Sequence, residues 1–172
     1  MPNWVTNEVT FTFDMSHQKR KFLDLVKSDD NPFDFDKIIP MPKIFNDICQ
    51  SKSGGNGLKW HYQDSTKPNG VGERLTELEV SRLKKEHGTL GSYDWCCENW
   101  GTKWNSVHHV ETGNDDYDDE SYVWFGFNTA WSPPTPIAHF LKHKFEGIKF
   151  RWFYRDESDM FCGYLDDDIG GF

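Results

Sequence analysis

The sequence predicts an α+β fold in which helices cover one face of an antiparallel sheet. Apolar and polar residues alternate with a period of two at the start of the chain and through most of its last third, which indicates strands. Apolar residues at helical spacing follow the first of these strands and precede a later one. A long stretch rich in glycine and polar residues separates the two regions, so the sheet is expected to carry an insertion.

The chain begins with a strand and a helix. Residues 5–14 alternate, which predicts a half-buried strand, and apolar residues at helical spacing over 17–27 predict a helix. Ser16 is the expected N-cap of this helix. The next segment, 33–42, alternates briefly and then contains two prolines, so an edge or extended segment is expected there.

The middle of the chain contains the clearest helical pattern. Residues 46–72 are rich in loop-forming residues and hold one short candidate strand at 58–62. Residues 73–87 are predicted to be helical, because acidic residues lead, basic residues follow, and Gly88 occupies the position past the end.

The last third contains strands separated by an acidic hairpin loop and by one helix. The expected strands are 107–111, 122–128, 148–154 and 160–165, and large residues on both sides of the second suggest that both its faces are covered. Thr135 is the expected cap of the helix, and Pro136 fits its first position. Once 29–105 is set aside as an α-rich insertion, the order is β-α-β-β-α-β with an extra C-terminal strand. This is the split β-α-β, ferredoxin-like pattern, in a single domain over 1–172.

Four segments carry motifs in order along most of the chain: "MPNWVTNEVTF" at the start, "FDFDKIIPMP" at 33–42, "YDWCCENWGTKWN" at 93–105 and "FNTAWSPPTP" at 127–136. Together they resemble the YubB-like family, whose members are carried by plasmids and phages. The resemblance implies a ferredoxin-like domain and an origin in a mobile genetic element. It implies no catalytic residues, because the family has no assigned biochemical function.

Composition and charge limit the function classes. Aromatic residues make up 16% of the 172 residues, so we expect a core built from a few large side chains. The formal net charge of -9 argues against broad binding to nucleic acid and suits an acidic surface that meets a basic protein. The N-terminal segment has no signal-peptide pattern, and no apolar run approaches the roughly 20 residues of a membrane span. We therefore expect a cytoplasmic protein with reduced thiols, and the resemblance implies that the cell is a bacterial host.

The segment "WCCENWGTKWN" at 95–105 combines three tryptophans with a lysine and two asparagines. A helix that runs to Trp100 and a turn at Gly101 would direct Trp104 back toward the sheet. One interpretation is a tryptophan-lined plug within the core, and the other is a groove with flat apolar walls and a few polar contacts. The candidate groove residues are Trp100, Lys103, Trp104, Asn105, Asn128, Thr129 and Trp131.

A second candidate surface is the acidic loop "NDDYDDE" at 114–120. Its carboxylates either form a solvated turn or dock a basic partner. The four aspartates that would carry such docking are Asp115, Asp116, Asp118 and Asp119. Acidic side chains at alternate positions resemble a calcium loop only faintly, because the central glycine and the distal glutamate of that motif are missing.

Metal and nucleophile chemistry have weaker support. A zinc site from Cys96, Cys97, His108 and His109 is disfavoured, because adjacent residues on a strand point to opposite faces. Motifs of nucleophilic and nucleotide-binding enzymes are absent from the sequence. No metal, cofactor or catalytic residue is therefore predicted.

RNA recognition is a further alternative, because some ferredoxin-like sheets stack bases on exposed aromatic side chains. Trp124, Trp152 and Phe153 are candidates for such stacking, with Arg151 and Arg155 beside them. The glycine- and aromatic-rich signature of RNA-binding sheets is absent, and the net charge opposes this interpretation.

The leading hypothesis is a non-enzymatic protein of a mobile genetic element. It would bind a host or element-encoded protein, such as a defence or replication component, through the acidic loop and the tryptophan-rich groove. The alternative is an enzyme or binding protein for a small nucleotide-like ligand held in that groove. The two hypotheses differ in what they require: a ligand site needs polar groups that converge in a pocket, and a docking protein needs an exposed charged or apolar patch.

Overall fold

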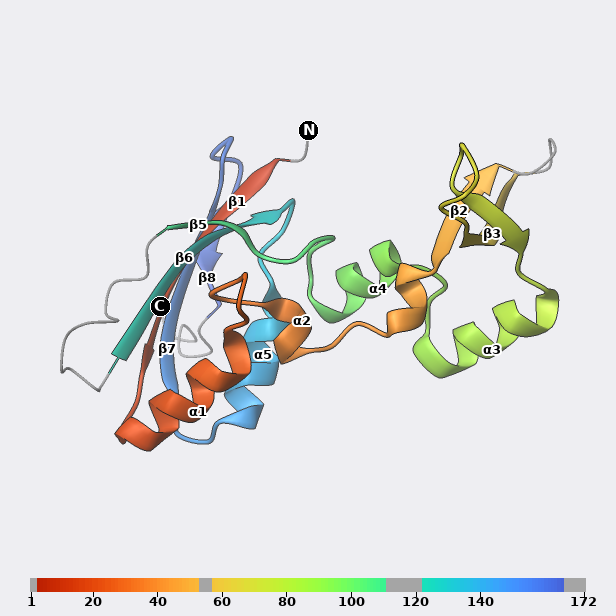
Figure 1. The fold of residues 1–172 in the computed structure, drawn as a ribbon. Helices are drawn as coiled ribbons and strands as arrows, with labels where there is room; N and C mark the ends of the chain where they lie inside the picture. Colours follow the sequence, from red (N-terminus) through yellow and green to blue (C-terminus); the bar gives the residue numbers. More distant parts are fainter. Residues whose placement is uncertain (1–2, 53–56, 111–121, 166–172) are drawn as a thin grey trace. The chain divides into compact units, whose positions relative to one another are not determined.

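The computed structural model describes residues 3–52, 57–110 and 122–165. The chain divides into two compact units, each with its own sheet (Figure 1). Unit 1 comprises Met1–Pro40 and Glu98–Phe172, and unit 2 comprises Met41–Cys97. The insertion expected over 29–105 contains unit 2, but its two ends belong to unit 1.

The described part of unit 1 holds an antiparallel sheet with the strand order β5-β6-β1-β7-β8. Its strands are β1 (Trp4–Thr12), β5 (Val107–Val110), β6 (Tyr122–Ala130), β7 (Lys149–Asp156) and β8 (Cys162–Tyr164). The first strand of the chain lies at the centre and pairs antiparallel with both β6 and β7. Helical crossovers follow β1 and β6, so four strands have the ferredoxin-like arrangement and β8 extends the sheet by a hairpin. The predicted fold class is confirmed.

One face of this sheet is covered by helices (Figure 1). They are α1 (Ser16–Val26), α2 (Phe35–Ile38) and α5 (Thr135–Lys144), and α2 contacts the other two. The fully buried side chains between the layers are mostly aromatic, as the composition predicts. They include Val9, Phe11, Phe22, Phe33, Phe127, Ile137 and Trp152.

A buried amide organises the polar part of this core. Asn7 has no exposed surface, and its Nδ2 donates to the hydroxyl of Thr129 and to the carbonyl of Val5, both at 2.9 Å. The indole Nε1 of Trp152 donates to Asn7 Oδ1 over 3.1 Å. Asn7 of β1 is thereby linked to Thr129 of β6 and Trp152 of β7. Its buried amide is satisfied by these partners, as buried polar groups generally are.

Three local predictions in unit 1 are wrong. The segment 33–42 contains the one-turn helix α2 instead of extended chain, because Asp34 caps it by accepting from the backbone N–H of Asp36. Ser16 and Thr135 are the first residues of α1 and α5, and neither helix has a side-chain cap.

Unit 2 is built on the antiparallel sheet β2-β3-β4. Its strands are β2 (Ile48–Lys52), β3 (Leu58–Gln63) and β4 (Val71–Arg74), with the 3₁₀ helix η1 (Lys43–Asn46) before them and α3 (Glu77–His87) after them. Thr76 and Glu79 form a capping box at the start of α3, and Gly88 ends it with a φ of 77°. Helix α4 (Ser92–Asn99) follows, and its last two residues, Glu98 and Asn99, are assigned to unit 1.

Candidate functional site

We use the term open face for the face of the unit 1 sheet opposite its helices, where the described side chains of β1 are exposed or half-buried. Alternation along β1 directs Val5, Asn7, Val9 and Phe11 into the core, so Trp4, Thr6, Glu8, Thr10 and Thr12 lie on the open face. The register places Thr10 between Trp124 of β6 and Arg151 of β7. It places Glu8 between Gly126 and Phe153, and Tyr164 of β8 beyond Phe153.

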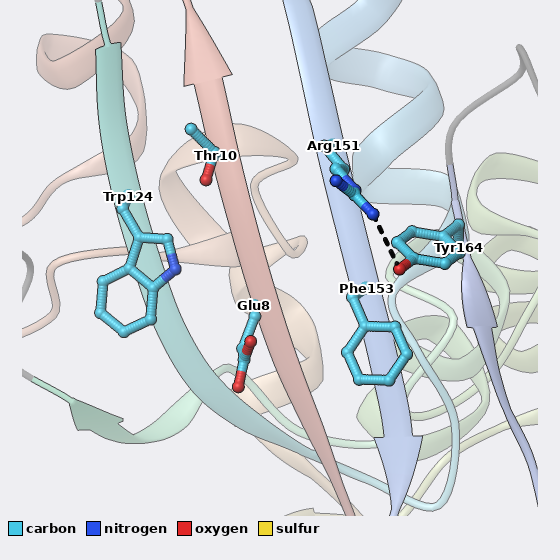
Figure 2. Close-up of a pocket in the computed structure, with 6 residues that line it drawn as sticks. All are labelled: Glu8, Thr10, Trp124, Arg151, Phe153 and Tyr164. Carbon is cyan, nitrogen blue, oxygen red and sulfur yellow. Dashed lines mark hydrogen bonds between the residues drawn. The ribbon is translucent and has the colours of Figure 1, made fainter.

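These side chains surround a shallow depression of about 280 Å³. Its lining residues are Glu8, Thr10, Trp124, Arg151, Phe153 and Tyr164, which are drawn in Figure 2. Glu8 lies between the rings of Trp124 and Phe153, and Thr10 lies nearer to Arg151 (Figure 2). The depression therefore combines three aromatic rings with one cation and one carboxylate.

Arg151 is positioned by its neighbour on β8. Its Nη2 donates to the hydroxyl of Tyr164 over 3.1 Å, and its guanidinium carbon lies 5.1 Å from the centre of the same ring. The ring of Phe153 lies 5.3 Å from that of Tyr164 in a tilted arrangement. The hydrogen bond uses one of the five N–H donors of the guanidinium, so the cation is oriented and still has donors for an anion.

Trp124 lies over the backbone of its own strand. A Cβ atom at Gly126 would approach Cη2 of Trp124 to 2.7 Å and Cγ2 of Val110 to 3.1 Å. Only glycine leaves room for the indole there. The ring of Trp124 therefore rests on the sheet as a flat surface.

A second group of aromatic side chains, the Trp104 cluster, lies at the Trp4 end of β1. It consists of Trp4, Lys103, Trp104, His108 and Trp131. The ring of Trp4 lies 6.0 Å from that of Trp104 and 4.7 Å from that of His108. Lys103 Nζ lies 3.9 Å from the ring centres of both Trp104 and Trp131. Trp104 is 44% exposed and Trp131 is 48% exposed.

The backbone at two members of this cluster is strained. His108 has a φ of 50° and Trp131 a φ of 74°. Residues other than glycine rarely adopt such values, because the Cβ atom then crowds the backbone. Strain of this kind persists where the surrounding structure enforces it, and it concentrates at ligand sites.

The structure brings three of the predicted groove residues together and gives three others roles in the fold. Lys103, Trp104 and Trp131 are grouped in the Trp104 cluster. Trp100 is 4% exposed and donates its indole N–H to the carbonyl of Ile39 over 2.9 Å. Asn105 Oδ1 accepts from the backbone N–H of Phe35, and buried Thr129 accepts from Asn7. Asn128 lies beside the cluster, with its Nδ2 3.5 Å from His108 Nδ1.

The open face contains residues that sequence reasoning missed. Glu8, Thr10 and Tyr164 were not candidates, although the polar positions of the first alternating strand point to one solvent-facing side. Trp152, a candidate for base stacking, lies in the core, whereas Trp124 and Phe153 line the depression. The four candidate aspartates of the acidic loop lie outside the described residues.

The described part of the chain was also compared with the requirements of metal sites, membrane spans and thiol or histidine chemistry. There, no group of three or more His, Cys, Asp or Glu side chains could hold a metal ion, and no helix is long and apolar enough to cross a membrane. All four cysteines are free thiols. His109 lies 2.9 Å from the Ser106 hydroxyl, and burial, then the charge of His108, lowers its pKa from 6.5.

Comparison with known proteins agrees with this fold. Residues 99–170 match a protein family described as a ferredoxin-like domain in Api92-like protein. The match covers β5, β6, α5, β7 and β8, which is less than half of the chain but most of the unit 1 sheet. Neither a curated protein nor a solved structure shows significant similarity to the chain.

Proposed function

We propose that this chain is a non-enzymatic binding protein whose open face holds a nucleobase-containing ligand. The observation that carries the proposal is the grouping of Trp124, Phe153 and Tyr164 around an oriented Arg151. Aromatic rings on a sheet stack on the flat faces of bases, and a guanidinium binds phosphate oxygens. The depression is shallow and open, which suits a stacked ligand better than an enclosed substrate.

The charge of the open face supports this ligand class. The whole chain has a net charge of -9, but among the described residues the strands β1 and β7 place Lys149, Arg151 and Arg155 against Glu8 on the open face. Arg155 lies 3.5 Å from Asp159, so part of its charge is already compensated. A few local cations predict modest affinity with a weak dependence on salt, in contrast to a broad basic surface.

An origin in a plasmid or phage is part of the proposal. It is supported by the four sequence motifs that resemble the YubB-like family. Binding of a host or element-encoded protein through the loop at 114–120 stays a prediction from the sequence. The described residues support the nucleotide-like ligand better, because they supply both rings and a cation on one surface.

The proposal is tested by fluorescence anisotropy with a fluorescein-labelled single-stranded hexanucleotide of mixed sequence. Phe153→Ala and Arg151→Ala are expected to weaken binding. Stacking on one ring contributes about 1–3 kcal/mol by alanine substitution, so Phe153→Ala should weaken binding by roughly 5- to 150-fold. Matched controls in unit 2 are Tyr93→Ala, which removes a 51% exposed ring, and Arg82→Ala, which removes an exposed cation.

The control variants are expected to bind as the wild-type protein does. Equal affinity of the wild-type protein and both open-face variants would refute the proposal. Absence of binding by the wild-type protein at millimolar concentration would refute it as well.

A further inference from the structure

We infer that the Trp104 cluster is a second stacking subsite, so that the ligand is a single-stranded oligonucleotide that contacts both ends of the open face. This inference rests on the proposed function. It adds a second binding site to the protein and sets a minimum length for the ligand. A mononucleotide bound in the depression beside Phe153 would not reach the Trp104 cluster.

The two aromatic groups share one side of one sheet. Trp4, which packs against Trp104 and His108, has the same orientation on β1 as Glu8 and Thr10. Glu8 and Thr10, which line the depression, are four and six positions from Trp4 on that strand, which corresponds to about 13 Å and about 20 Å at 3.3–3.4 Å per residue. A ligand that reaches from one group to the other must therefore be a chain of several nucleotides.

The surface between the two groups is polar and accessible. Thr6 and Glu8 are exposed on β1, and Asn128 of β6 lies opposite Thr6. Hydroxyl and amide groups of this kind bind the sugars and phosphates that connect stacked bases. A strand of nucleic acid would therefore meet hydrogen-bonding groups along its path, with aromatic surfaces at both ends.

The cluster itself combines rings with a cation at close range. Lys103 Nζ lies 3.9 Å from each of two indole rings that are both nearly half exposed. The lysine therefore occupies the place between the rings where a cationic ligand would bind. This disfavours a cationic ligand such as a basic peptide. An anionic ligand with flat groups fits better, since a base can stack on Trp104 while a phosphate pairs with Lys103.

The strained backbone is a second observation at the same place. His108 and Trp131 have positive φ angles, and His108 lies where the β5–β6 register shifts. The aromatic residues of the core, such as Phe11, Phe22 and Phe33, pack without positive φ angles. Strain at an exposed aromatic group points to a surface arranged for a ligand.

The test is a length series of single-stranded oligonucleotides, from dinucleotide to octanucleotide, measured by fluorescence anisotropy at low salt. Wild-type affinity is expected to rise with length. Trp104→Ala is expected to weaken octanucleotide binding about 5- to 150-fold and to remove most of the gain from length. Lys103→Gln keeps the tryptophans and is expected to reduce the slope of log affinity against log salt by about 0.7.

Circular dichroism and thermal unfolding of each variant establish that it is folded. If Trp104→Ala and Lys103→Gln bind the octanucleotide like the wild-type protein while Phe153→Ala weakens binding, the second subsite is refuted and the proposed function stands. If no oligonucleotide binds, both fall. If sedimentation equilibrium instead shows a dimer that Phe153→Ala dissociates, the open face is an interface between two copies, and both proposals are overturned.

Discussion

Arg151 donates a hydrogen bond to the hydroxyl of Tyr164 across the β7–β8 pair, over 3.1 Å. This contact links the cation of the open face to one of its rings. It depends on β8, the strand that the chain adds to the four ferredoxin-like strands. The extra strand therefore contributes directly to the candidate site.

The first prediction concerns this contact. Tyr164→Phe removes the acceptor but keeps the ring, so the guanidinium loses its fixed orientation. Oligonucleotide affinity is expected to fall about 2- to 10-fold, which corresponds to roughly 0.5–1.5 kcal/mol for one hydrogen bond. The measurement is the anisotropy titration, with Tyr93→Phe in unit 2 as the matched control. An unchanged affinity for Tyr164→Phe would show that the hydroxyl does not position Arg151.

The second prediction separates the core from the open face. Trp152→Phe leaves Asn7 Oδ1 without its donor inside the core, and an unsatisfied buried acceptor costs about 1–3 kcal/mol. We expect the free energy of unfolding in urea to fall by that amount or more. Trp124→Phe, the same exchange on the open face, is expected to change it by about 0.5 kcal/mol or less. Equal losses for both variants would contradict the assignment of the two faces.

The third prediction tests why residue 126 is glycine. Gly126→Val introduces a Cβ that would lie 2.7 Å from the Trp124 ring, so the ring must leave its place on the sheet. Oligonucleotide affinity is expected to fall to the level of Trp124→Ala. The double variant Gly126→Val with Trp124→Ala is expected to bind like either single variant. Wild-type affinity of Gly126→Val would mean that the ring position does not matter for binding.

The fourth prediction concerns base preference. Glu8 lies between the rings of Trp124 and Phe153, where a stacked base would present its edge (Figure 2). A carboxylate only accepts hydrogen bonds, so it favours a base edge with adjacent N–H donors, which guanine presents. We expect guanine-containing oligonucleotides to bind most tightly and Glu8→Gln to reduce this preference by about 10-fold. The measurement is competition among four otherwise identical oligonucleotides, and an unaltered order of preference in Glu8→Gln would contradict the role.

The fifth prediction follows from the pKa of His109. Burial, then the positive charge of His108, lowers this pKa below 6.5, and Asp34 opposes the shift only in part. The unfolded chain therefore binds a proton more readily than the folded protein does. Stability from this residue is complete above pH 6.5 and is lost as the pH falls through and below that value. His109→Gln is expected to flatten the decline of the unfolding free energy between pH 7 and pH 5, and an identical decline would refute the assignment.

The sheet was predictable because its pattern is local. Alternation over the first strand and the "SPPTP" helix start are properties of a few consecutive residues, and both appear close to the expected positions. The one-turn helix α2 was not, since its amphipathic pattern spans too few residues to be distinguished from a strand. The backbone N–H of Phe35 at its start donates to Asn105 Oδ1, and Asn105 is distant in the sequence.

The candidate site was predictable only in part. The sequence indicated Lys103, Trp104 and Trp131 because they lie in two short segments that contain tryptophan beside polar residues. Tyr164 and Glu8 join Arg151 through strand register, and register is set by packing of the whole sheet. When the strand register is unknown, Trp152 and Phe153 are equally good candidates for base stacking. In the structure Trp152 is buried and Phe153 lies on the open face.

Chemical-shift mapping tests the central claim most directly. Uniformly ¹⁵N-labelled protein is titrated with a guanine-containing octanucleotide at low salt, and the backbone amide and indole N–H signals are followed. The account predicts shifts concentrated in β1, β6, β7 and β8 and around Trp104, with the indole N–H of Trp124 among the most affected. Shifts confined to unit 2 or to the outer surfaces of α1 and α5, or no shifts at all, would contradict the assignment of the open face as the binding surface.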